Sequence, residues 1–398
     1  MNLESLRRKR VHRMGVRTNG HAGQRRIFFI LDRATRKFHG DVGLWLQYLE
    51  FARQKKASKK VSQILTSMLR LHPTRAELWI YAASYAMDER GDMTEARSYM
   101  QRGLRFCKHS RNLWIEYTRL EMVYMAKIAA RRQILGLDEE PSVKTSRPRT
   151  ELVDADILPL PNLTTLGVDP SQQTDDFIEE DALHKLSATP ALSGAIPIAI
   201  FNAAMNHFEG DASLGEEIFD IVANFHGIPC ASNIQHHIVD VLRGKTLTSP
   251  VALICFIREP VIDVEILSAD FPRALKSALD RLSRTLQKDL PFSASMKTMR
   301  TRMTLINRVM DWMLPFLDVP ELDQDIRKVL IATLKRLLGQ WRTVFQQIPR
   351  NNTTEIGELA TKLLDNGFED LAKPLVAFGL QMSPSESRLL SLQNQKVQ

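Results

Sequence analysis

Apolar side chains recur along most of this chain at intervals of three and four residues, which is the spacing of one face of an α-helix. Trp45, Tyr48 and Leu49 form one such stripe. No segment keeps the alternating apolar and polar pattern of a half-buried β-strand. The pattern therefore predicts an all-α fold.

A sequence repeat underlies the first third of the chain. Trp45, Trp79 and Trp114 are separated by 34 and 35 positions, and each follows a leucine. A second series keeps the same separations and consists of Ile30, Ile64 and Tyr99. A single helical hairpin cannot bury both of its apolar faces, so we expect neighbouring hairpins to stack into a continuous α-solenoid core.

Each tryptophan lies in the first helix of a predicted hairpin. The second helices are expected at 25–38, 59–71 and 94–107, with turns around Gly40, Pro73 and Gly91. A further hairpin without a tryptophan is expected at 197–208 and 214–225. Later helices are predicted at 233–242, 251–257, 271–288, 295–314, 321–345, 353–365 and 369–379.

Composition and pattern together divide the chain into five segments. We expect a basic N-terminal helix end and linker at 1–23, and the repeat array at 24–135. An acidic, proline-containing linker follows at 136–195, then a helical repeat-like region at 196–380 and a polar tail at 381–398. The first residues resemble the end of a helix, so we expect a helical segment upstream of Met1.

The hairpins resemble the half-a-TPR, or HAT, repeat of RNA-processing proteins. The resemblance lies in the Leu-Trp-x-x-Tyr helix and in the second helix Ala96-Arg97-x-Tyr99-x-x-x-Gly103-Leu104. The pairs Arg33-Ala34 and Arg102-Gly103 match the Arg-Ala near the end of the HAT second helix. Lys60 and Ala82 depart from the repeat's preferences. The resemblance makes Trp45, Tyr48, Trp79, Trp114 and Tyr117 structural repeat residues.

Three other stretches make the chain similar to a HAT-repeat family of the small-subunit processome, most closely over residues 1–225. They are the basic leader at 3–10, the helix at 114–135 and the segment Gly194-Ala-Ile-Pro-Ile-Ala-Ile200. The resemblance implies a non-catalytic scaffold that supports pre-18S rRNA processing in the nucleolus. The implied partners are β-propeller subunits of the processome, together with U3 small nucleolar RNA and pre-rRNA.

Charge adds a candidate RNA contact at the N-terminus. The whole chain has a net charge of +8, whereas residues 1–60 hold sixteen Lys or Arg against four Asp or Glu. Cations on a helix can follow a phosphate backbone, and the RNA-binding candidates are Arg7, Arg8, Lys9, Arg10 and Arg13. A nuclear localisation signal or a solvated helix end explains the same cluster equally well.

The sequence indicates no catalytic, metal or cofactor site. The sequence has no Gly-rich phosphate loop, no His-Glu-x-x-His helix and no Gly-x-Ser-x-Gly elbow, so we expect no catalytic residue, no metal and no cofactor. Cys230, His236 and His237 are the nearest approach to a metal cluster, but adjacent histidines point to different sides of a helix. The acidic run at 179–181 fits a solvated linker better than a cation site.

Two further readings concern surfaces. The aromatic stripe of the repeats could stack on unpaired bases, although packing against the next hairpin is the stronger interpretation. Exposed positions on the second helices, such as Lys37, Arg70 and Arg105, are candidate partner contacts. A HAT scaffold of splicing or mRNA 3′-end processing and a TPR-like chaperone adaptor are the rival functions, and an enzyme ranks last.

Overall fold

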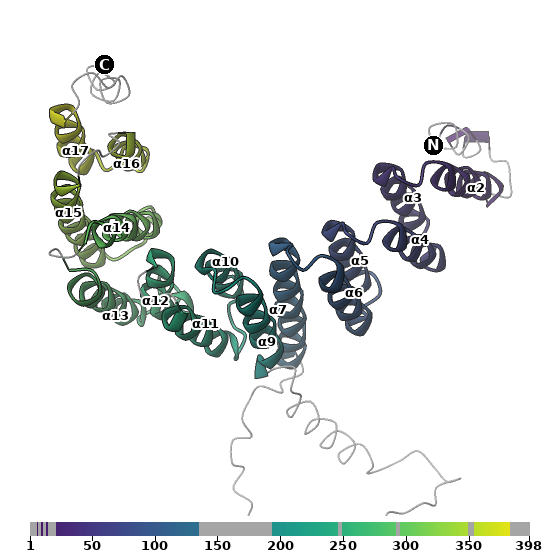
Figure 1. Cartoon of the computed structure of the whole chain (residues 1–398), viewed down its shortest axis with the longest axis horizontal. Coiled ribbons are helices and arrows are strands. Elements are labelled where there is room, and N and C mark those ends of the chain that lie inside the picture. The colour runs from purple at the N-terminus through teal and green to yellow at the C-terminus, as the bar shows by residue number, and fades with distance from the viewer. Residues whose placement is uncertain are drawn as a thin grey trace, which may run out of the picture. The chain divides into compact units, whose positions relative to one another are not determined.

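The computed structural model describes residues 6, 9–10, 13–14, 21–134, 193–245, 249–291, 295–348 and 354–382. These residues form α-helices and one π-helical stretch, and no strand occurs among them (Figure 1). The prediction of an all-α helical-repeat fold is confirmed. Contacts divide the chain into a first unit, residues 1–120, and a second unit, residues 121–398, which are described separately.

The first unit is built from consecutive antiparallel helices. They are α2 (His21–Lys37), α3 (Val42–Gln54), α4 (Ser58–Leu71), α5 (Ala76–Asp88), α6 (Met93–Phe106) and the start of α7 (Arg111–Ile134). Asp41 and Asp92 cap α3 and α6 by accepting hydrogen bonds from the Leu44 and Glu95 amides at 3.2 and 2.9 Å. Such caps stabilise a helix by about 1 kcal/mol.

Most of the predicted core positions of the first unit are buried, but Tyr99 and Trp114 are half-buried and Ile30 is exposed. Leu49, Leu65 and Met68 are at most 1% exposed, as the helical period requires. Ile30 is 55% exposed although its repeat counterpart Ile64 is only 4% exposed. Ile64 lies beside α3, the first helix of its own hairpin, whereas few residues before α2 are described.

The second unit continues the helical pattern. Its elements are the end of α7, α9 (Ala195–His207), α10 (Ala212–Ala223), α11 (Ala231–Lys245), α12 (Pro250–Ile262), α13 (Phe271–Arg284), the π-helix η2 (Thr285–Asp289), α14 (Met296–Leu317), α15 (Gln324–Gln347), α16 (Thr354–Asp365) and α17 (Glu369–Met382). Phe201, Phe219 and Trp341 are fully buried in its core.

Carboxylates on α10 connect helices that are distant in sequence. Arg308 of α14 donates from one guanidinium nitrogen to both carboxylate oxygens of Glu216 at 2.7 Å. Arg258 of α12 pairs with Asp220, one turn further along α10, at 2.9 Å. These pairs connect α10 to α14 and to α12 within the second unit.

The helix predicted at 251–257 is longer than expected, because α12 continues to Ile262 with Pro260 inside it. A proline in a helix cannot donate to the carbonyl four residues earlier, which here is that of Phe256. Arg281 of α13 donates to this carbonyl instead, at 2.8 Å. A side chain from the next helix therefore replaces the missing backbone hydrogen bond, and the helix survives the proline.

Candidate interaction surfaces

The three repeat tryptophans make the same hydrogen bond. The indole N–H of Trp45 donates to the carbonyl of His39 at 3.0 Å, and that of Trp79 donates to the carbonyl of Pro73 at 2.9 Å. Trp114 donates likewise to Lys108 at 3.1 Å. Each indole thus holds the turn that precedes its own helix, six residues back in the sequence.

Two of these carbonyls, those of His39 and Pro73, accept a second hydrogen bond. His72, directly after α4, donates from Nε2 to the His39 carbonyl at 2.8 Å. Cys107, directly after α6, donates from Sγ to the Pro73 carbonyl at 3.4 Å. Burial raises the pKa of the Cys107 thiol, which keeps the thiol protonated as a donor. Each of these two carbonyls therefore joins the turn before a hairpin to the turn after it.

The repeat aromatics leave little ring surface for a ligand. Trp45, Tyr48, Trp79 and Tyr117 are at most 5% exposed. Trp114 is half-buried. This burial favours the packing interpretation of the stripe over base stacking, because a stacked base needs an accessible ring face.

Gly103 explains the close approach of α6 to α5. A Cβ atom at this position would lie 2.9 Å from both Cβ and Cγ of Trp79 and 3.2 Å from Cδ2 of Leu113. Real Cβ atoms do not approach this closely, so the position accepts only glycine without a shift. Sequence reasoning singled out the Arg102-Gly103 pair but could not show which neighbour requires the glycine.

The basic residues proposed from the sequence are only partly described. Arg7 and Arg8 lie outside the described residues, whereas Lys9, Arg10 and Arg13 are helical and exposed. Lys37, Arg70 and Arg105 on the second helices are exposed as well. The acidic run at 179–181 and residues 136–192 of the linker predicted at 136–195 also lie outside the described residues.

Each unit has a sizeable groove among its described residues. In the first unit a groove of about 880 Å³ lies between α2, α3 and α4, lined largely by polar side chains that include Arg36, Lys60 and Gln63. In the second unit a cleft of about 760 Å³ is more apolar, with Leu267, Trp312 and Phe316 among its lining residues. The grooves suit extended chains rather than a buried small substrate.

Cys230, His236 and His237 do not converge. Cys230 donates from Sγ to the sulfur of Met125 at 3.7 Å, and Nε2 of His237 lies 2.9 Å from the side-chain Oδ1 of Asn202. His236 faces α12 instead, on another side of α11. Among the described residues no group of three His, Cys, Asp or Glu side chains is placed to hold a metal ion.

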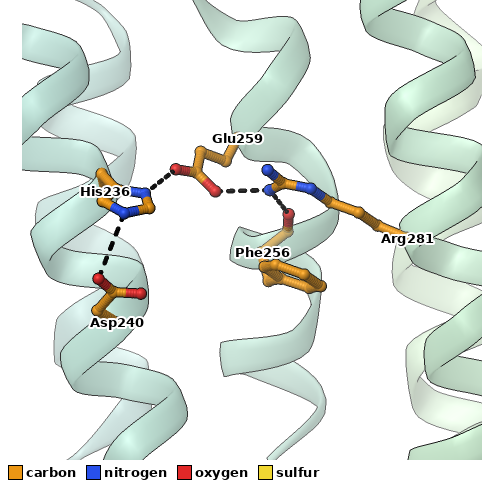
Figure 2. Close-up of polar contacts among 5 residues, drawn as sticks. All are labelled: His236, Asp240, Phe256, Glu259 and Arg281. Atoms are coloured by element: carbon orange, nitrogen blue, oxygen red, sulfur yellow. Dashed lines mark hydrogen bonds and ion pairs between the residues drawn. The ribbon is translucent and has the colours of Figure 1, made fainter.

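His236 belongs to a polar network across α11, α12 and α13 (Figure 2). Its Nδ1 lies 2.9 Å from Oε1 of Glu259, and Oε2 of Glu259 accepts from Arg281 at 2.6 Å. Asp240 lies 3.4 Å from Nε2 of His236. The hydrogen bond to Glu259, followed by the charge of Asp240, raises the pKa of His236 above its ordinary value.

This network predicts a pH dependence of stability. The pKa of His236 is higher in the folded state than in the unfolded chain. The contribution of the protonated His236 to the free energy of unfolding is therefore complete below pH about 6.5, and it disappears as the pH rises through the folded-state pKa. The side chain is 67% exposed, so we expect less than about 1 kcal/mol. Urea unfolding of the protein and of His236→Gln should differ more at pH 6 than at pH 8.5. An equal difference at both pH values would contradict the ion pair.

No helix among the described residues is both long and apolar enough to cross a membrane.

The scan against protein-family models gave no match. Curated relatives do match. U3 small nucleolar RNA-associated protein 6 of Schizosaccharomyces pombe is 40% identical over 139 residues, which are 34% of this chain and 28% of the relative. The Homo sapiens homologue is 32% identical over 108 residues, 27% of this chain and 18% of the relative.

This chain is homologous, over part of its length, to U3 small nucleolar RNA-associated protein 6. The Dictyostelium discoideum homologue of the same name extends the similarity, at 25% identity over 253 residues, to 62% of this chain and 37% of the relative. The chain thus spans less than two fifths of the length of each of these relatives of the U3 small nucleolar RNA-associated protein 6 family.

Proposed function

We propose that this chain is a non-catalytic scaffold in ribosome biogenesis, which supports pre-18S rRNA processing within the U3-containing small-subunit processome. The observation that carries the proposal is the similarity to relatives that share one name, U3 small nucleolar RNA-associated protein 6. The packing of the helices supports it, since helices linked in series present long, ordered surfaces.

The mechanism is positional. In the first unit, the carbonyls of His39 and Pro73 accept from a tryptophan and from the residue that follows the second helix of the same hairpin, which holds successive turns in one register. Partners seated along such repeats are held at fixed separations, so that cleavage of the RNA proceeds elsewhere in the assembly. The cleft of about 760 Å³ in the second unit is the seat that we assign to a protein partner.

The proposed partners are β-propeller subunits of the processome, together with U3 small nucleolar RNA and pre-rRNA, in the nucleolus. The exposed cations Lys9, Arg10 and Arg13, with Arg7 and Arg8 beside them in the sequence, are the proposed contact to RNA phosphates. Phosphate contacts of this kind weaken as salt displaces the cations, which gives the proposal a measurable signature.

Affinity purification of the tagged protein from its native cells tests the proposal, with the bound proteins and RNAs both identified. We expect β-propeller subunits and U3 small nucleolar RNA. Recovery of splicing or 3′-end processing factors in their place would overturn the pathway and keep the HAT scaffold, whereas chaperones alone would favour the TPR-like adaptor. The Lys9/Arg10/Arg13→Gln variant should retain the proteins and lose RNA at lower salt. An Arg273/Lys276/Lys328→Gln variant is the charge-matched control.

A further inference from the structure

The outer face of α2 gathers positive charge. Arg25, Arg26, Arg33, Arg36 and Lys37 are all exposed, and a helical turn of 3.6 residues places these positions on one side of the helix. Asp32 is the one carboxylate in α2, and it pairs with Arg36 at 2.7 Å. Within the described residues, Arg25, Arg26 and Arg33 form no ion pair.

An aromatic ring stands in the middle of this face. Phe29 is 67% exposed, and the repeat period aligns it with Gln63 of α4 and Ser98 of α6, which are polar. Its neighbour Ile30 is different, because the counterpart Ile64 is buried and Ile30 therefore occupies a packing position of the repeat. Packing between repeats explains an apolar residue at position 30, but it does not explain a phenylalanine at position 29.

The charge continues from α2 onto α4. Lys59 and Lys60 occupy the positions of Arg25 and Arg26 one repeat later, and both are exposed. Lys60 lines the polar groove between the two helices, together with Arg36 from the α2 side. The hydroxyl groups of Ser62, Thr66 and Ser67 line the same groove. A chain of regularly spaced negative charges can therefore pass from the cations of α2 to those of α4 across this polar groove, in which Arg36 pairs with Asp32.

We propose that the outer face of α2, with the adjoining edge of α4, binds single-stranded RNA. The cations contact successive phosphates, and the Phe29 ring stacks on an unpaired base. Single-stranded RNA fits this surface because unpaired bases offer the flat faces on which aromatic side chains stack, whereas duplex RNA hides them. The choice of RNA over an acidic peptide rests on the proposed function, but the site is separate from Lys9, Arg10 and Arg13.

The site is tested by binding of the full chain to a labelled oligouridylate, to an RNA duplex and to polyglutamate. Phe29→Leu keeps an apolar side chain and removes the stacking ring, so it should weaken oligouridylate binding by about 5- to 100-fold. Phe106→Leu is the matched control, because Phe106 is 58% exposed on α6 and lies outside the face. This control should bind as the unaltered chain does.

The cations are tested by salt dependence. Arg25/Arg26/Arg33→Gln should reduce the slope of log affinity against log salt by about 2, since each phosphate contact of a single strand contributes about 0.7. Arg273/Lys276/Lys328→Gln removes the same charge from exposed positions of the second unit and should leave the slope unchanged. Circular dichroism should show unchanged thermal unfolding for the α2 and second-unit variants, because their altered side chains are exposed. Phe106 stacks on Trp79 at 5.9 Å between ring centroids, so binding to the Phe106→Leu control is compared below its own unfolding transition.

Three results would overturn the inference. They are unchanged oligouridylate affinity in both α2 variants, equal affinity for polyglutamate, and loss of RNA binding only in Lys9/Arg10/Arg13→Gln. The last result would leave the RNA contact of the proposed function in place. Recovery of U3 small nucleolar RNA from cells is a separate readout, so failure of the α2 site and failure of the proposed function are distinguishable.

Discussion

Replacement of Trp79 by alanine is expected to lower the stability of the first unit by about 3–5 kcal/mol, the range for loss of a buried tryptophan. Trp79 is 5% exposed, contacts the Gly103 position and donates to the carbonyl of Pro73. Its loss leaves both a cavity and a weakened turn. Urea unfolding followed by circular dichroism should show an earlier transition for the first unit.

Two phenylalanine variants separate the cavity from the hydrogen bond. Trp79→Phe removes the indole N–H that holds the turn, whereas the buried indole N–H of Trp341 has no hydrogen-bond partner among the described residues. Trp79→Phe should therefore cost about 1 kcal/mol more than Trp341→Phe. Equal costs for the two variants would show that the indole bond to Pro73 contributes nothing to stability.

Gly103→Ala is expected to destabilise the first unit by about 1–2 kcal/mol. Overpacking against Trp79 costs about 1–3 kcal/mol, and the better helix propensity of alanine returns up to about 1 kcal/mol. The collision is with the Cβ and Cγ atoms of Trp79, close to the α5 backbone, where little movement is available. The change is measured as a shift of the urea midpoint.

Gly339→Ala is the matched control, with the opposite expected sign. Gly339 is exposed within α15, and a Cβ there would meet nothing within 4 Å. Only the propensity effect remains, so the variant should be more stable by about 0.5–1 kcal/mol. If both glycine variants shift stability in the same direction, the packing argument for Gly103 is wrong.

Most helices of the first unit can be predicted from the spacing of apolar residues in the sequence. The tryptophan spacing and the apolar stripes predict the helices of the first unit to within a few residues, because each buried position repeats with the helical period. The end of α12 could not be predicted in this way. Pro260 is a helix breaker by local rules, and the Arg281 donor that compensates for it comes from another helix. Sequence pattern does not contain that contact.

The candidate binding residues are predicted less well by the sequence than the helices are. The cations at 7–13 stand out as a charge run, but Phe29 was not singled out, because the pair Phe28-Phe29 looks like ordinary core. Phe28 lies 5.0 Å from the ring of Phe51, whereas Phe29 is exposed. Only neighbouring helices decide which of two adjacent aromatic residues is covered. The available signal was the comparison with Gln63 and Ser98 at the same repeat position.

The two kinds of connection in the first unit differ in their tolerance of length. The turns between hairpins, at 38–41, 72–75 and 107–110, all have four residues. The loops within hairpins differ, with three residues at 55–57 and four at 89–92, where Gly91 adopts a positive φ. An added residue in a turn would pull the tryptophan from its carbonyl, whereas an added residue in a loop disturbs neither partner. Tags or insertions are therefore better placed in the loops. The four-residue turns constrain the separation between each tryptophan and the carbonyl that it binds, so changes in repeat length are expected in the loops.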